Sequence, residues 1–170
     1  MSPLFRLMAI ASTISLAFAL PSSRKQQSCL TACEGTSLAT RFADLVGNYT
    51  AEKADAFLLV DYQDYSDGIN SLQQKPLGSV TFAGREAFKA AQEGHGGTPM
   101  VVDTVVATTC DTVVWTWTAT FGEAAKSARG INIVKFIEDD GAWWVERVDM
   151  EMNSLIYLED LGGTWSLPDQ

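Results

Sequence analysis

The chain has 170 residues, of which 46% are hydrophobic, 10% aromatic and 19% charged. This composition is typical of one folded globular domain and excludes a disordered tail, a collagen-like fibre and a multi-domain assembly. Twelve Lys and Arg residues against 21 Asp and Glu residues give a formal net charge of −9. Because such a charge repels phosphate groups, we expect no nucleic-acid partner and no anionic membrane partner.

Residues 1–19 predict a secretory signal peptide. Arg6 supplies a positive charge, an uncharged and mostly apolar run follows, and Ala17 and Ala19 suit a cleavage site. Because the run is shorter than the roughly 20 residues of a membrane-spanning helix, it favours a secreted, extracellular protein over one with an N-terminal anchor. The remainder divides into an N-terminal extension (20–36), a single domain (37–165) and a tail (166–170).

If the protein is secreted, its three cysteines are in an oxidising compartment. Where conditions are oxidising, two of the three thiols are expected to pair, and a bond to Cys110 would tie the N-terminal segment to the strands. We expect Cys33 as its partner, with Cys29 as the alternative. One distant histidine does not complete a metal site, so no metal is expected. Asn48 begins a glycosylation sequon and is expected to carry a glycan.

Helical patterns occupy the first half of the mature chain. Apolar residues at helical spacing predict a first helix around residues 38–49, and Thr50 is a suitable N-cap for a second. Residues 61–68 are polar and predict a turn, and residues 84–93 predict a third helix. A glycine-rich loop that contains His95 follows.

Strands are expected after the helices, over residues 101–107, 112–121, 131–138 and 142–153. Strict alternation within residues 113–121 collects aromatic side chains on one face of the second strand. The same alternation over residues 143–153 leaves neither face purely apolar, so that strand could border a cavity, a partner subunit or water. Helices followed by antiparallel strands predict an α+β fold with the helices on one face of a curved sheet.

Several segments resemble the nuclear-transport-factor-2-like (SnoaL-like) superfamily, and most closely its small secreted fungal members. The resemblance implies a cone-like antiparallel sheet, with three N-terminal helices on its concave face, around a pocket for a small hydrophobic molecule. Met152 departs from the pattern, because an aromatic residue is expected there. The residues that carry the resemblance are 64–71 (DYSDGINS), 80–88 (VTFAGREAF), 110–115 (CDTVVW), 129–131 (RGI) and 151–163 (EMNSLIYLEDLGG).

Three residues are candidates for acid–base catalysis, each with a structural alternative. Asp64 could abstract a proton if burial raises its pKa, or it could cap a turn. His95 could act as a base, although its glycine neighbours indicate an exposed loop. Asp103 could face inward as an acid or outward as a solubilising charge. Candidate ligand-binding residues are Tyr62, Tyr65, Trp115, Trp117 and Phe121, with Glu151 and Asn153, which could instead anchor the C-terminal segment.

Two kinds of function remain open at this point. The first is a cofactor-free lyase, isomerase or cyclase that acts on a hydrophobic metabolite. The second is a non-catalytic secreted binding or interaction module. The resemblance also implies a homodimer formed through the open face of the sheet.

Overall fold

A computed structural model describes residues 29–94, 97–120, 122 and 125–167. The predicted signal peptide lies outside these residues, as do most of the N-terminal extension and the end of the tail. His95 and Phe121 also lie outside them. None of the helices in the described ranges is both long and apolar enough to cross a membrane.

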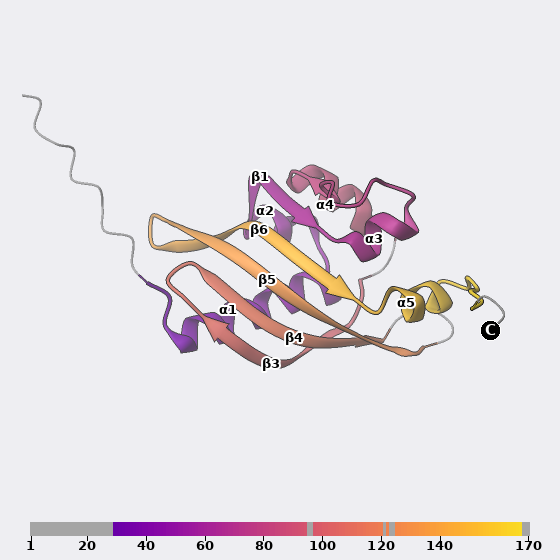
Figure 1. Cartoon of the computed structure of the whole chain (residues 1–170). Helices are drawn as coiled ribbons and strands as arrows, with labels where there is room; N and C mark the ends of the chain where they lie inside the picture. The colour runs from indigo at the N-terminus through magenta and orange to yellow at the C-terminus, as the bar shows by residue number, and fades with distance from the viewer. Residues whose placement is uncertain (1–28, 95–96, 121, 123–124, 168–170) are drawn as a thin grey trace, which may run out of the picture.

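The strands form one six-stranded sheet in the order β2-β1-β6-β5-β4-β3 (Figure 1). All neighbouring pairs are antiparallel except β1 and β6, which run parallel. The helices lie mainly on one face, so the predicted α+β class with a curved sheet is confirmed. The strands are β1 (Leu58–Tyr65), β2 (Phe82–Ala83), β3 (Met100–Thr108), β4 (Thr112–Thr120), β5 (Ser127–Asp139) and β6 (Ala142–Met152).

Local hydrogen bonds define the starts of several helices. Thr31 caps the first helix, and the side chain of Glu34 bonds back to the backbone of Thr31, which completes a capping box. This helix begins ahead of the domain boundary predicted at residue 37. Asn153 caps a short C-terminal helix that the sequence patterns did not predict. The helices are α1 (Ala32–Gly47), α2 (Ala51–Asp55), α3 (Asp67–Leu72), α4 (Arg85–Gln92) and α5 (Ser154–Asp160).

The turn predicted over residues 61–68 is wrong, because most of this segment belongs to β1. Its polar residues form a strand because β2 and β6 supply backbone partners on both sides. Tyr62, Asp64 and Ser66 are buried, whereas Asp61 and Gln63, on either side of Tyr62, are exposed. The alternation turns one carboxylate into the protein and keeps the others in solvent.

A β-bulge explains why the alternation predicted for β6 is also wrong. Lys135 of β5 pairs with Arg147, but the next residue, Phe136, pairs with Val145, which leaves Glu146 as an extra residue. After the bulge, each side chain of β6 points to the face of the sheet opposite to the one that strict alternation predicts. Val145 and Val148 are therefore both buried, and Arg147 is exposed.

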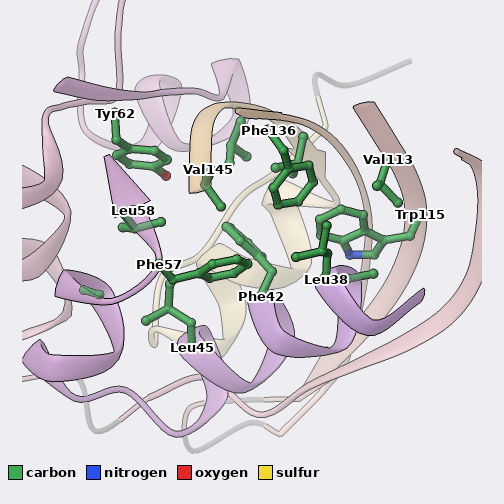
Figure 2. Close-up of a cluster of buried hydrophobic side chains, with 14 of the residues drawn as sticks. Leu38, Phe42, Leu45, Phe57, Leu58, Tyr62, Val113, Trp115, Phe136 and Val145 are labelled. Atoms are coloured by element: carbon green, nitrogen blue, oxygen red, sulfur yellow. The ribbon is translucent and has the colours of Figure 1, made fainter. Parts of the chain in front are cut away.

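The hydrophobic core lies between α1 and the sheet. Figure 2 shows side chains of α1, β1, β4, β5 and β6 meeting there. The ring of Phe42 on α1 packs edge-on against Trp115 on β4, with 5.6 Å between ring centroids. Trp115 is fully buried, so this part of the aromatic strand face serves the core.

A disulfide joins Cys29 to Cys110 and fastens the N-terminal segment to the turn between β3 and β4. The backbone N–H of Leu30 donates to the carbonyl of Cys110, which continues the attachment. The expected partner, Cys33, is therefore wrong and the alternative, Cys29, is confirmed. Cys33 lies on α1, is exposed and has a free thiol.

Candidate active site

A cavity of about 100 Å³ lies between the helices and the sheet. Side chains of α1, α3, α4 and α5 and of every strand contribute to its lining, so the whole fold is needed to form it. We call it the central cavity. Most of its wall is apolar, with Phe42, Val46, Phe82, Phe88, Met150 and Met152 among the contributors.

Asp64 is the acidic residue of the central cavity, and only 4% of its surface is exposed. Its Oδ2 accepts a hydrogen bond of 2.6 Å from the hydroxyl of Tyr62, which is itself fully buried. Its Oδ1 is buried and has no hydrogen-bond partner among the described residues. Asp64 thus keeps one oxygen fixed by Tyr62 and the other available to a ligand.

Burial raises the pKa of Asp64 to about 7. The cause is desolvation of the carboxylate, which the Tyr62 hydrogen bond offsets only in part and the charge of Asp149 reinforces. The pKa of the Tyr62 hydroxyl is raised well above its ordinary value for the same reason. Tyr62 therefore remains a hydrogen-bond donor, and Asp64 exchanges protons near neutral pH.

Asn132 on β5 is the second polar group of interest in the central cavity. Its Oδ1 accepts a hydrogen bond of 2.7 Å from Nε1 of Trp117 on β4. The residue is fully buried, and its Nδ2 has no partner among the described residues. Gly130 makes this arrangement possible, because a Cβ at that position would collide with the Trp117 indole.

The combination suits proton transfer within an apolar enclosure. A carboxylate with a pKa near 7 can take and return a proton, while an amide N–H can stabilise negative charge on oxygen. Of the described residues that line the cavity, none is Lys or Arg. No group of three or more His, Cys, Asp or Glu suited to a metal ion occurs within the described ranges.

The family model for an NTF2-like domain matches residues 28–164, which is most of the chain. The protein belongs to the NTF2-like family. A search of curated proteins found no match.

Solved structures show the same NTF2-like fold at low sequence identity, and the likeness therefore concerns the fold alone. One is IdmH, a proposed polyketide cyclase from Streptomyces antibioticus, with 14% identity, a TM-score of 0.57 and coverage of 76% of this chain and 99% of that one. A proposed SnoaL-like polyketide cyclase from a Jannaschia species has 12% identity, a TM-score of 0.54 and coverage of 85% and 99%. A proposed ketosteroid isomerase from Kribbella flavida has 15% identity, a TM-score of 0.51 and coverage of 80% and 83%.

The NTF2-like fold brings only some of the sequence-predicted site residues together. Asp64 and Trp117 line the central cavity, and Tyr62 contacts Asp64 from the core. Trp115 is buried in the core and is not part of the cavity wall. Tyr65 lies on the opposite face of the sheet, where the Arg147 guanidinium stacks on its ring, with Cζ 4.1 Å from the ring centroid.

Three predicted polar candidates have structural partners elsewhere in the NTF2-like fold. Asp103 is exposed on β3, where it accepts a hydrogen bond from Thr118. Glu151 accepts from the backbone N–H groups of residues 67 and 68 at the start of α3. Asn153 caps α5. The contact of Asp103 matches the alternative of an outward charge, and that of Asn153 matches the alternative of anchoring the C-terminal segment, whereas Glu151 instead holds the start of α3.

Asn132 and Tyr157 line the cavity but were not among the sequence candidates. Asn132 could have been found, because it is a single amide among the inward-facing even positions of β5, between Gly130 and Val134. Tyr157 lies on α5, and burial raises the pKa of its hydroxyl. Without that helix in the prediction, no pattern directed Tyr157 toward the cavity.

Proposed function

We propose that this NTF2-like protein is a cofactor-free isomerase or cyclase in which Asp64 is the general base for a small hydrophobic carbonyl compound. The observation that carries the proposal is the Asp64 carboxyl group, which is buried in an apolar cavity with a pKa of about 7 and one unpaired oxygen. The proposed activities of the structural neighbours belong to the same class of chemistry.

The proposed reaction begins when Oδ1 of Asp64 removes a proton from the carbon next to the carbonyl group. The electron pair of that C–H bond becomes a C=C bond, and the carbonyl π electrons move to oxygen to give an enolate. Where a C=C bond adjoins that carbon, the enolate extends over it as a dienolate, and return of the proton to the far carbon shifts the double bond and completes an isomerisation. Attack of the enolate carbon on a second carbonyl group forms a ring, and the proton goes to the new alkoxide.

Tyr62 has a positioning role in this scheme. Its hydroxyl holds Oδ2 at 2.6 Å, so that Oδ1 is the oxygen left for the substrate. Since the bond favours the ionised carboxyl group, Tyr62 also limits how far burial raises the pKa of Asp64. The outcome is a base that is largely ionised just above neutral pH and strong enough to accept a proton.

The replacement Asp64→Asn is expected to abolish protein-dependent proton exchange, because it keeps the shape of the side chain and removes the base. The measurement is NMR of cyclohexanone and acetophenone in heavy water, following loss of the protons next to the carbonyl. General-base catalysis predicts a rate with wild-type protein roughly 10²-fold or more above that with Asp64→Asn. Asp103→Asn, an exposed carboxylate outside the cavity, is the matched control and should retain the wild-type rate.

Equal exchange with wild type and Asp64→Asn for both ketones would contradict the proposal. The second candidate, a non-catalytic binding or interaction module, would then stand. It is favoured by the size of the cavity, since about 100 Å³ is below the roughly 300–1,000 Å³ of typical ligand sites. Methionines at three positions of the wall, Met100, Met150 and Met152, can readjust to admit a larger molecule.

We propose in addition that the protein is secreted after cleavage behind Ala19, as in the small fungal members it resembles, and that it forms a homodimer. The Cys29–Cys110 disulfide supports an oxidising compartment, and Asn48 is exposed at the end of α1, where a glycan has room. On the open face of the sheet, Ile131 and Ile133 are 40% and 45% exposed, which supports burial by a second copy.

These proposals predict the form of the protein that a eukaryotic cell releases. Its intact mass should correspond to a chain that begins at Leu20, with an added glycan that is lost in Asn48→Gln. Sedimentation should show a dimer, and Ile133→Glu should convert it to a monomer by placing a charge in the interface. Retention of residues 1–19, an unmodified Asn48, or a monomer at high micromolar concentration would each refute the corresponding proposal.

A further inference from the structure

We infer that Asn132 binds the carbonyl oxygen of the substrate through Nδ2, and that the substrate of the central cavity is an uncharged ketone. This inference rests on the proposed function and adds the group that receives the developing negative charge. It starts from two buried polar atoms that lack a partner among the described residues, Oδ1 of Asp64 and Nδ2 of Asn132. One is an acceptor and the other a donor, and both residues line the same cavity.

The orientation of the Asn132 amide is fixed by chemistry. The indole N–H of Trp117 can only donate, so the atom that it meets at 2.7 Å must be the amide oxygen. The NH₂ group is consequently the end of the amide that is left to donate a hydrogen bond to a ligand. Because an unpaired buried donor is costly, a ligand that offers an acceptor there gains a hydrogen bond without displacing an existing one.

Trp117 itself has little room to move. It is almost fully buried, and its indole lies against Gly130, where the absence of a side chain leaves room for the ring. Asn132 is therefore attached to a rigid neighbour, as a hydrogen-bond donor to a transition state needs to be. The donor is formed before the substrate arrives, so no reorganisation is needed during the reaction.

The charges of the cavity define the substrate class. Asp64 contributes negative charge when ionised, and no Lys or Arg is found among the described lining residues. A carboxylate or phosphate substrate would therefore enter against repulsion and find no cation. A neutral ketone meets an apolar wall, a donor for its oxygen and a base for its neighbouring C–H bond.

The volume restricts what part of the ketone is enclosed. A cavity of roughly 150 Å³ accommodates a benzene ring. The central cavity, at about 100 Å³, is smaller than that, so a six-membered ring enters only after the methionines of its wall readjust. We therefore choose cyclohexanone, a small cyclic ketone, as the probe.

The test compares wild type, Asn132→Leu and Asn132→Ala, with Asp64→Asn and Asp103→Asn as references. Asn132→Ala also removes the donor and cannot overfill the cavity wall, so it remains informative if Asn132→Leu does not fold. Isotope-edited infrared spectra of carbonyl-labelled cyclohexanone should show a lowered C=O frequency in wild type and Asp64→Asn. Both Asn132 variants should lose that shift, and their proton exchange should fall roughly 10²-fold.

The two readouts separate the inference from the proposed function. A C=O frequency and an exchange rate that are unchanged in both Asn132 variants would overturn the role of Asn132, while loss of exchange in Asp64→Asn would still support Asp64. Exchange that persists in Asp64→Asn would overturn the proposed function, while the infrared shift would still report the contact with Asn132. Absence of any bound-ketone band in wild type would overturn the assignment of a ketone.

Discussion

At pH 8 the replacement Asp64→Asn is expected to stabilise the protein by about 4 kcal/mol more than it does at pH 4. The pKa of Asp64 is about 7 in the folded protein, against the ordinary value of 3.8 for an aspartate in water. Each unit of difference corresponds to about 1.4 kcal/mol. The folded state therefore binds the Asp64 proton more tightly than the unfolded state does.

The direction follows from proton linkage. Below the unfolded pKa, the carboxyl group is neutral in both states and Asp64 costs nothing. As the pH rises from about 4 to 7, the unfolded chain releases the proton first, so the contribution of Asp64 to stability falls over that window. Above pH 7 the full cost is present. An asparagine, which is neutral throughout, does not carry that cost and can still accept the Tyr62 hydrogen bond.

Urea denaturation of wild type and Asp64→Asn at several pH values measures this difference directly. The exposed Asp103→Asn variant provides the matched control, and its effect should not follow the same pH dependence. A difference between pH 8 and pH 4 of under about 1 kcal/mol for Asp64→Asn would show that Asp64 titrates as an ordinary carboxyl group. That result would also remove the basis for its role as a base at neutral pH.

Loss of the Cys29–Cys110 disulfide is the second large effect that we expect. The bond spans 81 residues of sequence, and cross-linking a loop of that length lowers the entropy of the unfolded chain. The chain-entropy model gives a loss of about 4 kcal/mol in the free energy of unfolding for Cys29→Ser. Denaturant titration under non-reducing conditions measures it.

Cys33→Ser is the control for this substitution, because Cys33 is exposed and takes no part in the bond. Its stability should equal that of the wild type, with and without reductant. Reductant should lower the stability of the wild type to that of Cys29→Ser and leave Cys29→Ser itself unchanged. A wild type that is insensitive to complete reduction would contradict the stabilising role of the bond.

Much of the fold could be predicted because its signals are local. Helical spacing located the first helix, and alternation located β3, β4, β5 and β6 to within a few residues. The exceptions depend on partners distant in sequence. The polar residues of β1 form a strand only because β6 lies beside them, and the bulge at Glu146 is visible only through its pairing with β5. In both cases contacts with distant strands override what the local sequence alone would favour.

The candidate site was predictable in part for the same reason. Asp64 could be chosen as an acid in a segment with phenol side chains, but its burial depends on the strand that replaced the predicted turn. Met150 and Met152 reach the cavity only because the bulge moves them to that face. Asn132 carried a signal in its inward register, although that signal could be used only once the two faces of β5 had been distinguished.

The parallel pairing of β1 with β6 has a consequence for how the proposed site forms during synthesis. Asp64 lies on the first strand of the chain, whereas the neighbour that completes the sheet around it is the last strand. Until β6 has docked, the carboxyl group lies in water and keeps an ordinary pKa, because desolvation is what raises it. Pairing of strands so far apart in the sequence costs loop-closure entropy and is intrinsically slow. In a nascent or C-terminally truncated chain, Asp64 is thus present without its raised pKa. The proposed activity is therefore confined to the finished protein.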